Sequence, residues 1–117
     1  MTVPMPPNVA NARQHWRVKL NAKQEYWRKL NLMEAAGAFP KPPYPTPARS
    51  EIHARMFLGA QMDHDNAVAR MKWLLDWLCA SRYIADDSPK ALSWQGFPEQ
   101  IVKRDGNYRI ELTLTAR

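Results

Sequence analysis

Four aspartates in two close pairs are the residues of this 117-residue chain best suited to chemistry. Asp63 and Asp65, the entrance pair, precede a long segment with helical apolar spacing, and Asp86 and Asp87, the exit pair, follow it. Carboxylate oxygens are hard ligands that suit Mg²⁺ or Mn²⁺. Such an ion activates water and stabilises the charge that develops on a phosphate under attack. If the two pairs converge, they predict metal-assisted hydrolysis of a phosphoester.

Convergence depends on the segment between the pairs. Its pattern predicts a helix from about Asn66 to Arg82, and a helix of that length spans roughly 25 Å. The pairs can therefore meet only if the chain after this helix folds back along a sheet. The alternative is that Asp63 or Asp65 is an ordinary N-cap and that the exit pair forms an ordinary turn. The sequence alone leaves both interpretations open.

The helix predicted over residues 66–82 is apolar on more than one side. One stripe contains Val68, Met71, Leu75 and Leu78, and a second contains Trp73, Leu74 and Trp77. Such a helix lies either deep in a core or against a partner chain. In a domain this small we expect the second arrangement, and therefore a homodimer.

Three further patterns predict elements in the first half of the chain. Helical spacing predicts a helix from Asn11 to about Ala36, with an apolar stripe formed by Trp16, Leu20, Trp27 and Leu30. Residues 1–9 are rich in proline and form at most a short edge strand. Alternation over residues 50–58 predicts a half-buried strand, whose inner face carries Ile52, Ala54, Met56 and Leu58.

The C-terminal part predicts a β-hairpin, because residues 100–104 and 108–115 flank the turn signal Asp105-Gly106. The proline-rich residues 40–47 form a stiff internal linker that is too short to separate domains. We therefore expect one domain over residues 1–117. Its fold class is α/β or α+β, with a mixed β-sheet packed against two main helices.

Positive charge is concentrated in the first half of the chain. Residues 1–60 contain nine lysines and arginines and three acids, whereas residues 61–117 contain eight of each. A basic half suggests a polyanionic partner, although a solubilising surface would explain the charge equally well.

Several motifs occur in a fixed order. The first group consists of Asn11-Ala-Arg13-Gln-His15-Trp16 and then Tyr26-Trp27-Arg28. The second group consists of Asp63-His-Asp65-Asn66, then Lys72 and Asp76, and then Tyr83-Ile-Ala-Asp86-Asp87. The third is the C-terminal segment Arg109-Ile-Glu-Leu-Thr-Leu-Thr115. As an ordered set, these motifs resemble the RusA-like Holliday junction resolvases, phage-borne members included. The resemblance covers most of the chain. The N-terminal strand of that family is shortened here and rich in proline.

The resemblance implies a Mg²⁺-dependent endodeoxyribonuclease, with Mn²⁺ as a substitute, that cleaves Holliday junctions in DNA recombination and repair. It implies that Asp63, Asp65 and Asp87 are the catalytic metal ligands, with Asp86 as a fourth. It also implies that Lys72 is catalytic and lies near the scissile phosphate or the acids.

Lys72 has two compatible interpretations. It follows Asp65 by seven residues on the same helix face, so its side chain could reach back to the entrance pair. It could also pair with Asp76, four residues further along the helix. His64, between the entrance aspartates, is expected to be a bystander rather than a metal ligand.

Basic residues of the first predicted helix are expected to contact the DNA backbone, whose neutralisation supplies most sequence-independent affinity. Trp16 and Trp27 are expected to fill the core rather than stack on bases. The expected DNA-binding residues are Arg13, His15, Arg17, Lys19, Lys23 and Arg28.

Composition predicts a cytoplasmic protein. No apolar run approaches the ~20 residues of a membrane span, no secretory signal is evident, and the one cysteine, Cys79, resembles a small hydrophobe. We expect a homodimer on a four-way DNA junction, with no membrane and no small-molecule cofactor. A two-fold dimer would present one acidic cluster to each of two opposed strands. Two alternatives stay open: a non-catalytic phage DNA-binding protein of the same fold, and a metal-dependent phosphoesterase or ribonuclease.

Overall fold

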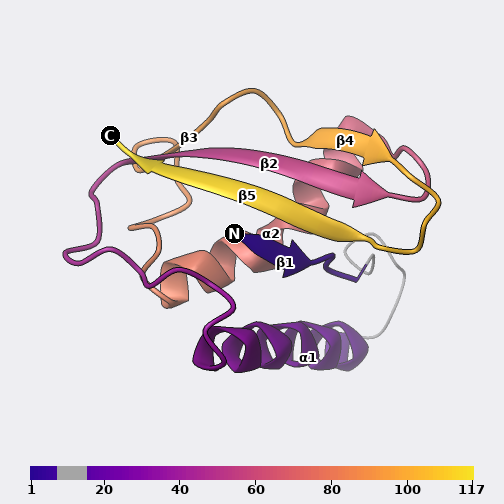
Figure 1. The fold of residues 1–117 in the computed structure, drawn as a ribbon, viewed down its shortest axis with the longest axis horizontal. Helices are drawn as coiled ribbons and strands as arrows, with labels where there is room; N and C mark the ends of the chain where they lie inside the picture. Colours follow the sequence, from indigo (N-terminus) through magenta and orange to yellow (C-terminus); the bar gives the residue numbers. More distant parts are fainter. Residues whose placement is uncertain (8–15) are drawn as a thin grey trace.

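The protein folds as a small α+β domain with one mixed sheet of five strands and two helices (Figure 1). The computed structural model describes residues 1–7 and 16–117, except for the side chain of Trp16. The elements are β1 (Thr2–Pro4), α1 (Trp16–Ala35), β2 (Ser50–Leu58), α2 (His64–Ala80), β3 (Leu92–Trp94), β4 (Glu99–Val102) and β5 (Arg109–Ala116). The predicted fold class is confirmed.

Strand β2 is the centre of the sheet. It pairs antiparallel with β5 from Ser50 to Phe57, and parallel with β3 and then β4 along its other edge. Its alternation matches the prediction, because Ile52, Ala54 and Met56 are fully buried while the residues between them are half-buried. The inner face of β2 thus forms the floor of the core. Strand β1 pairs with the far edge of β5, which confirms the predicted short edge strand.

The predicted C-terminal hairpin is wrong. Strands β4 and β5 do not pair with each other; they lie on opposite edges of β2, and residues 103–108 cross its end. The turn at Asp105-Gly106 still forms, since the Asn107 backbone N–H donates to Asp105 Oδ1 at 3.0 Å and Gly106 has a φ of 74°. The two strands separate because β2 has two edges, and β4 pairs with one of them while β5 pairs with the other. A local turn signal cannot reveal that a central strand separates the two strands it joins.

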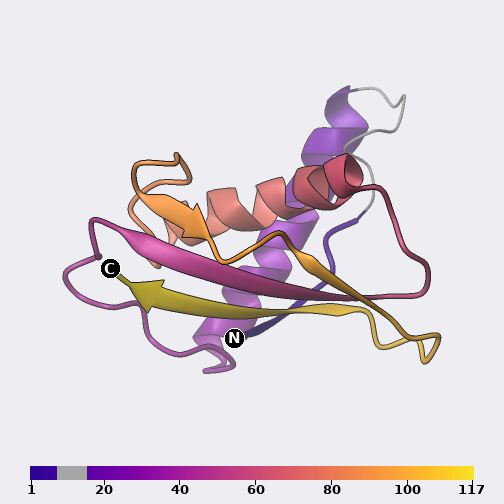
Figure 2. The same ribbon diagram turned by 90° about the horizontal axis from the view of Figure 1, so that it is seen from above.

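Helix α2 is buried within its own chain, so its apolar character does not indicate a partner. It packs on one face of the sheet, and α1 packs against α2 and β1 (Figure 2). Five of the six buried residues of α2 come from the two predicted stripes, namely Met71, Leu74, Leu75, Trp77 and Leu78, and the sixth is Ala67. Val68, which is 42% exposed, departs from the predicted first stripe. The second stripe faces α1, and it no longer motivates the predicted homodimer.

Two indole hydrogen bonds fix α1 against α2. Trp27 Nε1 donates to the carbonyl of Trp73 at 3.0 Å, and Trp77 Nε1 donates to Asn31 Oδ1 at 2.8 Å. Trp27 therefore packs between the helices, as predicted. The predicted stripe of α1 is wrong at Leu20, which is 44% exposed. Neither described helix combines the length and the apolar character that crossing a membrane requires.

Residues 40–47, the proline-rich segment, pack against the C-terminal end of α2. The Tyr83 hydroxyl donates to the Pro40 carbonyl at 2.7 Å, and Thr46 Oγ1 donates to the Arg82 carbonyl at 3.3 Å. The proline-rich segment is thus part of the domain, and it covers the end of the molecule at which β2 begins.

Candidate active site

The entrance pair lies at the first turn of α2, with both carboxylates exposed. Asp63 is the N-cap residue by position, since its carbonyl accepts the Ala67 N–H at 2.9 Å. Its side chain makes no cap hydrogen bond. Asp65 is the acidic residue of the first helical turn, where a negative charge complements the helix dipole. The N-cap interpretation therefore explains the place of Asp63 but leaves its carboxylate available.

Gln100 fixes the loop that carries the entrance pair. Its side-chain oxygen accepts the Met62 backbone N–H at 2.8 Å, and its side-chain NH₂ donates to the Met62 carbonyl at 2.9 Å. Because Gln100 lies on β4, these two bonds tie the residue before Asp63 to the sheet. Sequence reasoning missed this residue, because no local pattern marks a side chain that mimics a paired strand.

His64 packs against an aromatic ring rather than turning toward the entrance carboxylates. Its ring centroid lies 4.0 Å from that of Phe97, in an edge-to-face arrangement. Phe97 itself is 70% exposed, so the pair forms a small aromatic contact on the surface. The contact gives His64 a packing role on the surface, and its expected place as a bystander beside the metal stays a prediction.

The exit pair forms a turn. Asp86 Oδ1 accepts the Asp87 backbone N–H at 2.9 Å. A hydrogen bond from the Ser88 side chain, together with that backbone N–H, holds the pKa of the exposed Asp86 carboxyl below its usual range. This is the ordinary turn that the sequence left open as an alternative.

One chain does not bring the two pairs together. The 17 residues of α2 separate them, which corresponds to roughly 25 Å along the helix axis. The exit pair precedes β3, which pairs with the first residues of β2, whereas the entrance pair follows the last residue of β2. Within residues 1–7 and 16–117, no group of three or more His, Cys, Asp or Glu side chains is placed to hold a metal ion.

Asp76 draws Lys72 away from the entrance pair. Lys72 Nζ lies 3.9 Å from Asp76 Oδ1, and Lys23 Nζ of α1 lies 3.3 Å from Asp76 Oδ2. The i,i+4 pairing considered for Lys72 is therefore present. Lys23 also lies 5.1 Å from the centroid of the Trp27 ring, so this predicted DNA contact is largely engaged between the helices.

The thiol of Cys79 lies near the exit pair and near Asp76, whose charges affect its pKa. Burial raises the pKa of this thiol to about 11, and the nearby charges of Asp87, Asp86 and Asp76 add to that effect. The thiol therefore stays protonated at neutral pH and is a poor nucleophile. Its half-buried packing agrees with the expectation of a small hydrophobe.

The other predicted DNA-binding residues fall into two groups. Arg13 and His15 lie outside the residues that the structure describes. Arg17 and Arg28 are exposed on α1 and Lys19 is half-exposed. Arg28 lies 3.7 Å from Glu25, but both side chains are highly exposed, and such pairs contribute little.

No family model matches this chain, and no curated protein matches it. The ordered motifs and the geometry described above are therefore the basis on which a function can be inferred. The strongest feature of that geometry is the exposed entrance pair on a helix start that Gln100 ties to the sheet.

Proposed function

We propose that this protein is a divalent-metal-dependent endodeoxyribonuclease that cleaves four-way DNA junctions, as RusA-like resolvases do, in DNA recombination and repair. The observation that carries the proposal is the entrance pair. Two exposed carboxylates lie two residues apart in the motif that resembles the family, and the carboxylate of Asp63 makes no cap hydrogen bond. Their rigid attachment to β4 gives them a fixed position relative to the sheet.

The entrance pair fits Mg²⁺ without help from the exit pair. Mg²⁺ keeps several of its waters, and proteins usually bind it through one or two carboxylates together with substrate phosphates. Asp63 and Asp65 supply that number of carboxylates, and their exposure leaves room for the remaining ligands. Mn²⁺ suits the same oxygen donors.

The residues at the entrance of α2 would have three separate roles: holding the ion, attracting the phosphate and positioning the loop. Asp63 and Asp65 would hold the ion, which when bound supplies an activated water and neutralises charge on the phosphate. The positive end of the α2 helix dipole would attract the phosphate itself, since a helix N-terminus favours anions. Gln100 would act as a positioning residue, because it fixes the loop before Asp63.

A cleavage assay tests the function directly. The purified protein is incubated with Mg²⁺ and a four-way junction, a nicked duplex, a linear duplex or an RNA duplex. We expect paired cuts in the junction alone, and none after chelation of the metal. Preferential cleavage of RNA would favour the ribonuclease alternative. Binding to the junction without any cleavage would favour the non-catalytic DNA-binding protein, which the separation of the two acid pairs also supports.

Asp87 can join the entrance pair only from a second chain. In a two-fold dimer in which the exposed faces of the α2 helices, which carry Val68 and Lys72, meet antiparallel, the entrance of one helix lies beside the exit of the other. Under this arrangement Asp63→Asn and Asp87→Asn are each inactive. A heterodimer of the two variants nevertheless contains one intact site, because both substitutions fall in the other site.

Mixing the two variants after subunit exchange therefore restores nicking of the junction, which a denaturing gel detects. Mixing either variant with itself is the control. If the mixture stays inactive although each variant is folded, the site is not shared between chains. If Asp87→Asn alone cuts as fast as the unaltered protein, Asp87 has no catalytic role and the entrance pair acts alone.

A further inference from the structure

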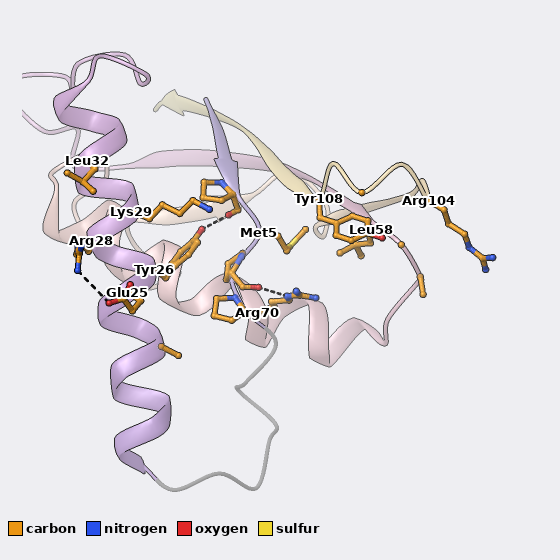
Figure 3. Close-up of a pocket in the computed structure, with 17 residues that line it drawn as sticks. Met5, Glu25, Tyr26, Arg28, Lys29, Leu32, Leu58, Arg70, Arg104 and Tyr108 are labelled. Atoms are coloured by element: carbon orange, nitrogen blue, oxygen red, sulfur yellow. Dashed lines mark hydrogen bonds and ion pairs between the residues drawn. The ribbon is translucent and has the colours of Figure 1, made fainter.

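A large groove opens at the same end of the molecule as the entrance pair. Its volume is about 1240 Å³, and its walls come from residues 4–7, α1, α2, residues 58–60 and the crossing segment 104–108. Figure 3 shows Tyr26 and Lys29 on one side, Arg104 on the opposite rim, and Met5, Leu58 and Tyr108 between them. Residues 58–60 form part of one wall, and the chain continues from them to Asp63 within three residues.

The groove has an excess of positive charge. We call it the basic groove after the three cations Lys29, Arg70 and Arg104. Its only acidic lining residue, Glu25, already lies 3.7 Å from a fourth cation, Arg28. None of the ion pairs among the described residues includes Lys29, Arg70 or Arg104. The groove therefore presents three positive charges without a carboxylate to balance them.

Arg70 is the central feature of the basic groove. It is half-buried on α2, and its Nε donates to the Pro6 carbonyl at 2.7 Å, the one hydrogen bond its side chain makes within the described chain (Figure 3). A guanidinium has five N–H donors, so most of them remain for a ligand. Burial lowers the pKa of this group, but an arginine remains charged at neutral pH. A partly buried charge without a counterion is less well solvated than an exposed one, and a bound anion would compensate for the lost solvation.

An aromatic surface lies in the same groove. Tyr108 is 48% exposed, and its ring crosses Gly59 so closely that a Cβ there would lie 2.6 Å from the hydroxyl oxygen. The absence of a side chain at residue 59 lets the ring lie across this loop. Cations beside an exposed aromatic ring are the features with which proteins hold a single nucleic acid strand.

We infer that the basic groove binds the phosphodiester backbone of a DNA strand and leads it to the entrance pair. Arg70 is the phosphate anchor, because a guanidinium binds phosphate oxygens in pairs, and Lys29 and Arg104 add charge on the two sides. This inference rests on the proposed function for the identity of the polyanion. It changes the predicted DNA contacts, since two of its three cations lie outside α1.

The test measures DNA binding without metal, by fluorescence anisotropy of a labelled single strand, a duplex and a junction over a range of salt concentrations. The main variant is Lys29→Gln/Arg104→Gln, whose side chains pack little. Its control, Lys41→Gln/Arg49→Gln, removes the same charge from exposed residues near the start of β2. We expect the main variant to bind at least about tenfold more weakly and to lose about one unit of salt dependence per contact. The control binds nearly as the unaltered protein does.

Arg70→Gln and Arg70→Lys then test the anchor. We expect Arg70→Gln to bind least and Arg70→Lys to fall between, because lysine keeps the charge and loses the paired geometry. Thermal unfolding of each variant checks the contact with Pro6. If Arg70→Gln is unstable, the Lys29/Arg104 variant still decides the question.

Three results would overturn the inference. The first is that the main variant binds DNA as its control does. The second is that Arg70→Gln is folded and binds normally. The third is that a polyglutamate peptide competes as well as DNA does, which would assign the groove to an acidic protein.

The same experiments separate this inference from the proposed nuclease activity. If DNA binds in the groove and no DNA is cut with Mg²⁺, the inference stands and the proposed activity fails. If the groove variants bind and cleave the junction as the unaltered protein does, the activity stands and the inference fails.

Discussion

We expect Asp63→Asn and Asp65→Asn each to reduce single-turnover cleavage of a four-way junction by at least about 100-fold, which corresponds to ~2.7 kcal/mol of activation free energy. The physical reason is that each change would remove one of the two carboxylates proposed to hold the ion at the entrance of α2. An amide oxygen in the same place is neutral and binds Mg²⁺ more weakly. The measurement uses saturating protein, so that the rate reports the chemical step.

Binding to the junction without metal behaves differently. We expect Asp63→Asn to bind equally well or slightly more tightly, because one negative charge near the DNA backbone is lost. Asp105→Asn is a matched control, since Asp105 is exposed in a turn and an asparagine can still accept the Asn107 N–H. Cleavage by Asp63→Asn at a rate close to that of Asp105→Asn would show that the entrance pair does not hold the metal.

Trp77→Ala produces the largest change in stability, a loss of about 3–5 kcal/mol of unfolding free energy. Trp77 is 1% exposed, and its ring lies 5.7 Å from that of Tyr83 and 5.8 Å from that of Phe39 between centroids. The substitution therefore leaves a cavity where α2 meets the segments that follow both helices. A loss of this size is a large part of the total stability of a small domain. Urea unfolding followed by circular dichroism measures it.

Two further variants show which property of Trp77 matters. Trp77→Phe keeps most of the ring and loses the hydrogen bond to Asn31, so we expect a smaller loss of about 1–2 kcal/mol. Phe97→Ala removes a ring that is 70% exposed and costs under about 0.5 kcal/mol. A Trp77→Ala protein as stable as Phe97→Ala would mean that α2 is not packed as described.

Local patterns predicted the parts of the fold that local physics decides. The bounds of β2 follow from alternation, because one face of a strand is buried and every second side chain must be apolar. The pattern of α2 predicted a helix to within two residues at each end. It could not tell whether the second apolar stripe meets another chain or another helix, since Trp73 and Leu74 bury the same surface in either case.

Pairing between distant segments escaped prediction. Strand β3 has three residues, too few for a periodic signal, and β4 was assigned to β5 because a turn joins them. Gln100 matters to the entrance pair only because β4 lies beside β2. The three cations of the basic groove come from positions 29, 70 and 104, and nothing in their local sequence relates them.

For the entrance and exit pairs too, one property could be predicted from local sequence and another could not. Their places at the start and after the end of a helix follow from the sequence, whereas their separation follows from the topology. After α2 the chain does return along the sheet, as β3 and then β4 beside β2. Asp86 and Asp87 come before this return, next to the beginning of β2, so they stay at the end of the sheet away from Asp63.

The position of β5 between β1 and β2 also governs the order in which the protein acquires its structure. Strand β1 has no other partner among the described strands, and β2 lacks a neighbour on that edge until residues 109–116 are present. During synthesis on the ribosome, neither β1 nor this edge of β2 can pair until the C-terminal strand has been made. The helices can form earlier, because their hydrogen bonds join residues that are close in sequence. Contacts over such long sequence separations slow folding. Nascent chains arrested before residue 109 therefore expose two open strand edges, which are the natural binding sites of chaperones and of other unfinished chains.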